Sequence, residues 1–128
     1  MLVSVTALYA AILAIIIVAL GINVTMHRVK LKVPLGDGGN PLMLRMIRIH
    51  ANAIEYIPIA LMLMLAYEIN GGWHAALHAA GVALVAGRVL QTGGMWGTET
   101  AGLGRQAGQS LTWLAIAALA VLNIWQIL

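Results

Sequence analysis

Residues 45–58 place a row of polar side chains directly before the apolar run 59–66. The polar side chains of this row are Arg45, Arg48, Asn52, Glu55 and Tyr56. On a helix, at about 100° per residue, they fall within an arc of roughly 100°, whereas His50 points to the other side. We call this arc the polar stripe. Its guanidinium, amide, carboxylate and phenol groups can together bind a small zwitterionic or anionic molecule.

The depth of the polar stripe is what suggests a site. Ionisable groups at the edge of a bilayer or inside it are costly, and they usually mark function. Two purely structural roles remain open for the same residues. Arg45 and Arg48 can lie at an interfacial helix end and reach lipid phosphates. Glu55, which lies deeper, can form a structural ion pair with Arg48.

Two further arginines follow in the sequence. Arg88 comes after Gly87, and Arg105 lies in the segment 104–108. Alone, each fits best as a determinant of membrane topology. Together with the polar stripe, they predict a basic pocket on one side of the bilayer.

The composition predicts an integral membrane protein. The chain has 128 residues, of which 62% are hydrophobic and 9% are charged, whereas soluble domains carry about 25% charged residues. With no cysteine in the chain, disulfides and thiolate metal sites are excluded. His74 and His78 are one helical turn apart without a carboxylate at a useful spacing, so we expect no metal site. The net charge of +3 indicates topology and lipid headgroups rather than nucleic acid.

The elements that must hold these residues are four apolar stretches, each near the length of about 20 residues that a bilayer requires. We expect spans at about 2–25, 41–70, 73–92 and 109–128. The fold class is therefore all-α, a single transmembrane domain over 1–128 built as a four-helix bundle. Asn40 can cap the second span with Pro41 at its first position, and Gly71-Gly72 can end it. Gly93-Gly94 and Gly97 are expected to break the third.

The basic residues predict the orientation. All seven Lys and Arg residues fall between spans one and two or around the connection between spans three and four. By the positive-inside rule that side is cytoplasmic, so we expect both termini on the opposite side.

The sequence of the second span resembles that of a known family, the membrane-associated proteins in eicosanoid and glutathione metabolism (MAPEG). The string from Arg48 to Pro58 is similar to the second-helix signature of its leukotriene C synthase branch, which lies close to the microsomal glutathione transferases. The loop 35–42 is similar to that of bacterial members. Gly87-Arg88 and Arg105-x-x-Gly108 follow in the expected order. The resemblance covers roughly 28–112.

The resemblance implies a homotrimer in a bacterial inner membrane, with glutathione as co-substrate at the subunit interface. The glutathione-contacting positions that match are Arg48, Asn52, Glu55 and Tyr56, and Arg88 and Gln91 are expected beside them. Glu55 would receive the ammonium, and Arg105 matches the arginine that favours the thiolate. Arg28 resembles a second basic position near the site.

Two positions depart from the pattern of the family. Where catalytic members carry Tyr or His on the third helix, this chain has Gln91, and where they carry Tyr it has Met95. An amide can hydrogen-bond but cannot act as a general acid or base. The resemblance to the family implies a glutathione transferase that conjugates a lipophilic substrate or reduces a peroxide. The alternative is a non-catalytic lipid-binding or scaffold subunit of a larger membrane complex. A small transporter is a third possibility, which the lack of an inverted repeat disfavours.

Overall fold

The computed structural model describes residues 3–96 and 102–128, which form four helices. They are α1 (Ser4–Leu31), α2 (Pro41–Ile69), α3 (His74–Trp96) and α4 (Leu103–Ile127). No strand occurs among the described residues. All four helices are long and apolar enough to cross a membrane, as the sequence predicted.

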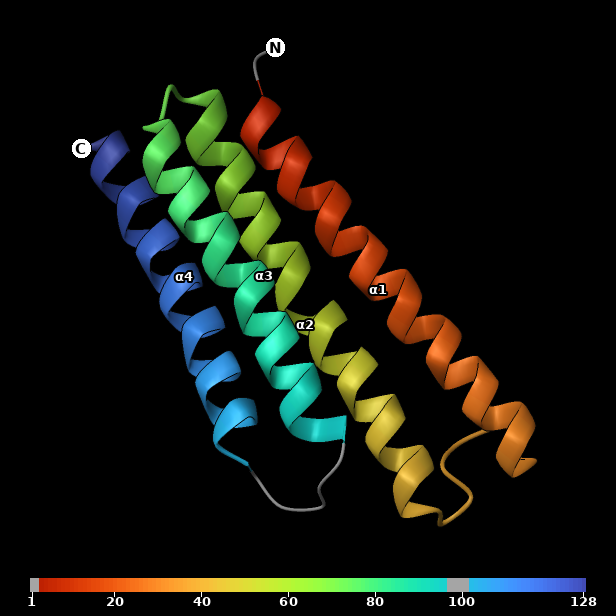
Figure 1. Ribbon diagram of the computed structural model, residues 1–128. Coiled ribbons are helices and arrows are strands. Elements are labelled where there is room, and N and C mark those ends of the chain that lie inside the picture. Colours follow the sequence, from red (N-terminus) through yellow and green to blue (C-terminus); the bar gives the residue numbers. More distant parts are fainter. Residues whose placement is uncertain (1–2, 97–101) are drawn as a thin grey trace.

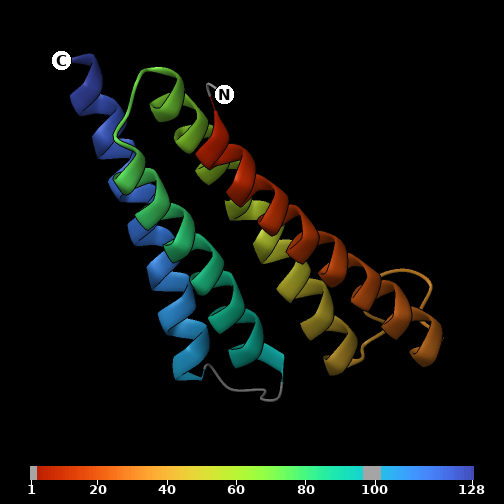
Figure 2. The ribbon, with the colours of Figure 1, turned by 45° about the horizontal axis from the view of Figure 1, so that its top comes forward.

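The helices form two pairs. α3 and α4 make the most extensive pairing, α1 runs along α2, and α1 does not contact α4 within the described residues (Figures 1 and 2). Both termini lie at one end of the bundle, and the loop between α1 and α2 lies at the other (Figure 1). The arginines therefore lie toward the loop end of the bundle.

The core lies between the helices and is apolar. Its fully enclosed members include Leu13, Ile57, Met64, Leu84 and Leu119. The outer faces are apolar as well: Ile15 is 70% exposed and Val121 is 64% exposed. Apolar outer faces are expected where the solvent is lipid. Each helix there satisfies its own backbone groups and needs to expose only apolar side chains.

The ends of α2 confirm the capping prediction. The side chain of Asn40 accepts hydrogen bonds from the backbone of Leu42 and Met43, with Pro41 in the first position. At the other end Gly71 has φ of 80°, a left-handed conformation that glycine adopts at no steric cost.

Three helices extend beyond the predicted spans: α1 and α3 at their ends, and α4 at its start. α1 continues past 25 to Leu31, because its last turns hold basic residues that are good helix formers and favour the negative helix end. α3 continues through Gly93 and Gly94 to Trp96. Gly94 serves packing instead of termination, since a Cβ atom there would overlap the backbone of α4. Gly97 lies outside the described residues.

The start of α4 also differs, and this affects the site. The helix begins at Leu103, not near 109, so Arg105 lies in its first turn. Polar residues such as Arg and Gln are good helix formers, so the end of an apolar run does not mark the end of a helix.

One contact joins the start of α1 to the end of α2. α1 has no side-chain cap of its own. The buried carboxylate of Glu68 in α2 accepts the backbone N–H of Val5 at 2.8 Å and of Thr6 at 2.7 Å. A carboxylate at a helix N-terminus satisfies free N–H groups and favours the positive end of the helix dipole.

Candidate functional site

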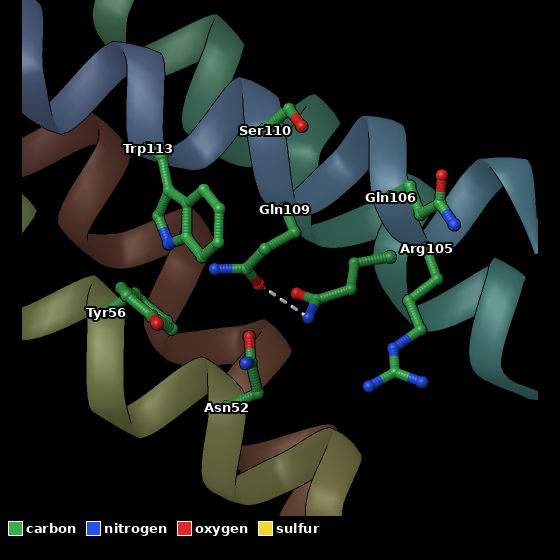
Figure 3. Close-up of a pocket in the computed structure, with 8 residues that line it drawn as sticks. Asn52, Tyr56, Arg105, Gln106, Gln109, Ser110 and Trp113 are labelled. Carbon is green, nitrogen blue, oxygen red and sulfur yellow. Dashed lines mark hydrogen bonds between the residues drawn. The ribbon is translucent and has the colours of Figure 1, made fainter. Parts of the chain in front are cut away.

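A cavity of about 510 Å³ opens between α2, α3 and α4. The residues that line it are Asn52, Tyr56, Gln91, Arg105, Gln106, Gln109, Ser110 and Trp113 (Figure 3). Four of the predicted site residues are thus brought together, from three helices: Asn52, Tyr56, Gln91 and Arg105. No carboxylate or histidine lines the cavity among the described residues.

Beside the cavity, α3 and α4 approach each other closely. A Cβ atom on Gly87 would lie 2.7 Å from Oγ1 of Thr112 and 2.9 Å from the carbonyl oxygen of Gly108. Both distances are shorter than van der Waals contact, so only glycine fits. Small residues allow such approach between membrane helices.

Arg88 lies behind the cavity wall and does not line it. Its side chain is 2% exposed. Nη1 donates to Oδ1 of Asn52 at 2.6 Å, and Nη2 donates to Oγ1 of Thr112 at 2.6 Å. Arg88 was predicted to contact the ligand. In the structure it joins three helices, because a buried guanidinium must direct its donors to acceptors inside the protein. Its contact with a ligand stays a prediction.

The Arg88 contact fixes the direction of the Asn52 amide. With Oδ1 of Asn52 turned to the guanidinium, the amide NH₂ group is left for the cavity that Asn52 lines. Asn52 therefore presents a hydrogen-bond donor to the cavity.

The side-chain amides of Gln91 and Gln109 form a second polar contact between helices. Nε2 of Gln91, which is buried, donates to Oε1 of Gln109 at 2.8 Å (Figure 3). Nε2 of Gln109 is itself buried and has no hydrogen-bond partner among the described residues. A buried donor without a partner is uncommon and calls for a physical reason.

The cavity has a cationic end and an aromatic end. Figure 3 shows the guanidinium of Arg105 on one side of the amides and the rings of Tyr56 and Trp113 on the other. The two rings pack edge to face with centroids 6.5 Å apart. Trp113 is 54% exposed, so the aromatic end reaches the lipid-facing surface.

Arg48 and Glu55 lie outside the cavity. Nη1 of Arg48 is 3.5 Å from Oε1 of Glu55, and the two side chains are 52% and 48% exposed. The ion pair that the sequence left open as an alternative is thus present. His50 lies against Gly21 of α1, on the other side of α2 from the stripe.

Arg28 is also remote from the cavity of its own chain. Its Nη1 donates to the carbonyl oxygen of Gly36 at 2.8 Å and of Val33 at 3.3 Å, and so holds the loop that follows α1. Its predicted place near a ligand stays a prediction.

Sequence reasoning missed half of the cavity lining: Gln106, Gln109, Ser110 and Trp113. A signal was present, because Arg105, Gln109 and Trp113 recur every four residues and so share a helix face. It was overlooked because the fourth span was expected to begin only at 109.

Comparison with known proteins agrees with this architecture. The model of the MAPEG family matches residues 6–125. Two similar proteins are both named inner membrane protein YecN, from Escherichia coli strain K12 and from Escherichia coli O6:H1 strain CFT073. Each is 38% identical over 127 residues, which cover 94% of this chain and 91% of the relative.

Proposed function

This chain is a membrane protein that belongs to the MAPEG family, and from that premise we propose that it is a glutathione transferase-like enzyme. It would activate the glutathione thiol for conjugation to, or peroxide reduction of, a lipophilic substrate. The observation that carries the proposal is the position of Arg105 in a cavity lined otherwise by neutral donors and aromatic rings.

The charge of the cavity suits glutathione, which carries two carboxylates and one ammonium. Arg105 and the NH₂ group of Asn52 are donors toward acceptor groups of a ligand. The buried guanidinium of Arg88 stands directly behind Asn52 and adds a positive charge that no carboxylate neutralises among the described residues. Donors and cations in a partly dry site hold anions well.

Arg105 would act on the sulfur. A cysteine thiol has a pKa near 8.5, and an adjacent cation lowers it. One pKa unit corresponds to about 1.4 kcal/mol, so a two-unit shift needs about 2.7 kcal/mol. A single close, partly desolvated guanidinium can supply this.

The site is completed across an interface between copies of the chain. Glu55, which would receive the ammonium, is half exposed beside Arg48 and lies outside the cavity. A homotrimer would bring the polar stripe of one copy to the cavity of another, and Arg28 would contribute at the same boundary. The electrophile would enter from the lipid between subunits, in a bacterial inner membrane with both termini on the non-cytoplasmic side.

One observation favours a second function. Gln91 takes the position at which catalytic relatives carry a hydroxyl or an imidazole, and its amide is bonded to Gln109. Neither amide can transfer a proton. A non-catalytic subunit that binds lipid and joins a larger membrane complex would keep this fold without needing such a group.

Glutathione binding to the detergent-purified protein tests both functions, with the ultraviolet absorbance of the thiolate recorded against pH. We expect a thiolate at a pH well below 8.5, and we expect Arg105→Ala to abolish it with little loss of affinity. Binding without a thiolate would favour the non-catalytic function. Absence of binding would remove glutathione from the proposal.

A further inference from the structure

The unpartnered amide of Gln109 points to the class of the second substrate. Gln109 lines the cavity, and its buried Nε2 bonds to no described atom. Its Oε1 is already held by Gln91. The side chain is therefore fixed at one end and offers N–H donors at the other, beside the rings of Tyr56 and Trp113 (Figure 3).

We propose that Gln109 binds the carbonyl oxygen of a lipophilic α,β-unsaturated carbonyl compound and stabilises the enolate that forms when the glutathione sulfur adds to it. This inference rests on the proposed function. Gln109 would be a catalytic residue, because it touches the atom on which charge develops.

The amide of Gln109 suits this substrate class. Sulfur attack on an epoxide or a hydroperoxide releases an alkoxide or hydroxide, which needs a proton donor. The described cavity lining holds no carboxylic acid, imidazole or cysteine, and its hydroxyl groups are those of Tyr56 and Ser110. The amide of Gln109 donates hydrogen bonds without giving up a proton. An enolate spreads its charge and needs only hydrogen-bond donors until water protonates it.

The addition is balanced in atoms and electrons. The thiolate sulfur forms a bond to the β-carbon, and the carbon–carbon π bond breaks. The electron pair moves to the carbonyl oxygen, where Nε2 of Gln109 donates. Water then protonates the α-carbon and restores the carbonyl group. The reaction consumes glutathione and the enone, and needs no oxidant or reductant.

The geometry allows both ends of the reaction on one helix. Arg105 and Gln109 are one turn apart on α4, which is about 6 Å along the axis. Their side-chain ends lie on opposite sides of the Gln91–Gln109 hydrogen bond (Figure 3). A thiolate held by Arg105, the forming sulfur–carbon bond and the three-carbon conjugated carbonyl unit would together span from the guanidinium to Nε2 of Gln109. The alkyl tail of the substrate would lie against Tyr56 and Trp113 and leave toward lipid, since Trp113 is half exposed.

The test compares two electrophiles in the full-length protein. One is trans-3-nonen-2-one, an enone. The other is para-nitrobenzyl chloride, whose displacement leaves its charge on chloride. In Gln109→Met we expect kcat/KM for the enone to fall about tenfold to a hundredfold, at or below the usual effect of losing an oxyanion donor. The chloride should change less than about twofold, a difference too small to reflect a lost transition-state contact.

Gln126→Met is the matched control. Gln126 is on the same helix but outside the cavity, where it donates to the carbonyl oxygen of Asn70. It should change neither reaction. An equal loss of both reactions in Gln109→Met would mean that Gln109 only shapes the cavity, and no loss would exclude it from the reaction. Either result overturns the inference.

A binding measurement on the unaltered protein covers the case in which Gln109→Met does not fold. The glutathione conjugate of the enone keeps its ketone, whereas S-nonylglutathione has none. We expect the ketone conjugate to bind at least about fivefold more tightly, which corresponds to one hydrogen bond. Equal affinity overturns the inference. A protein that forms the thiolate but does not conjugate the enone overturns it too and leaves the proposed function standing, whereas loss of thiolate formation removes both.

Discussion

Arg88 in α3 and Asn52 in α2 are joined by a 2.6 Å hydrogen bond from Nη1 to Oδ1. A second guanidinium nitrogen, Nη2, donates to Oγ1 of Thr112 in α4. One side chain thus links three helices and, at the same time, turns an amide NH₂ group toward the cavity. A stabilising contact and the polarity of the site are consequences of one residue.

Replacing Arg88 should therefore destabilise the bundle. Arg88→Met removes the hydrogen bonds to Asn52 and Thr112 and leaves both residues without this donor, at a cost of about 2–4 kcal/mol. Thermal unfolding in detergent, followed by tryptophan fluorescence, measures this. Lys30→Met, at an exposed position, is the control and should be neutral. Equal melting temperatures for the two variants would contradict the structural role.

The direction of the Asn52 amide leads to a sharper prediction. In Asn52→Asp the carboxylate can still accept from Arg88, so the bundle should keep its stability. The variant has lost its donor toward the cavity and gained a negative charge there. Glutathione affinity should fall at least about tenfold, as for a lost charge-assisted hydrogen bond.

Isothermal titration and thermal unfolding of the same Asn52→Asp preparation separate these effects. Undiminished affinity would mean that Asn52 does not face the ligand. A large fall in stability would mean that the bond to Arg88 needs an amide. Asn123→Asp is the comparison, since Asn123 donates to backbone carbonyl oxygens and should lose stability.

The sequence predicted those features that depend on local chemistry. Both ends of α2 were predicted correctly, since Asn40, Pro41 and Gly71 act through their own backbone neighbours. The starts and ends taken from apolar runs were less accurate. Hydrophobicity reports where lipid is, while α4 extends beyond the apolar run to Leu103.

The different positions of Arg88 and Arg105, one buried and the other at the cavity, could not be predicted from the sequence. Arg88 and Arg105 look alike as single basic residues near the end of a span. Only the close approach at Gly87 brings Thr112 within reach of Arg88 and so buries it, while Arg105 is left exposed at the cavity. That difference is tertiary.

Gly87 should accordingly tolerate no side chain. In Gly87→Ala the new Cβ atom would press on Gly108 and Thr112 and force α3 from α4, which should destabilise by about 1–3 kcal/mol. Gly93→Ala is the matched control, because nothing lies within 4 Å of its added Cβ atom. That variant should be neutral or stabilise the helix by about 0.5–1 kcal/mol. Similar melting temperatures for the two would disprove the close packing at Gly87.

The two glutamates of α2 should have separable roles. Glu68 is buried and accepts two N–H groups of α1, one on each carboxylate oxygen. In Glu68→Gln only one oxygen remains and the charge is lost, so stability should fall by about 1–2 kcal/mol. Its glutathione affinity should not change, because the α1 N-terminus lies at the end of the bundle away from the arginines (Figure 1).

Glu55→Gln should behave in the opposite way. Glu55 is half exposed and pairs only with an exposed Arg48 among the described residues, so the melting temperature should hardly change. If Glu55 receives the glutathione ammonium, its neutralisation should weaken binding by about tenfold or more. Parallel titration calorimetry and thermal unfolding of the two variants measure both properties. Equal affinities in Glu55→Gln and Glu68→Gln would place the ammonium elsewhere, and a large loss of stability in Glu55→Gln would show that its pair with Arg48 is structural.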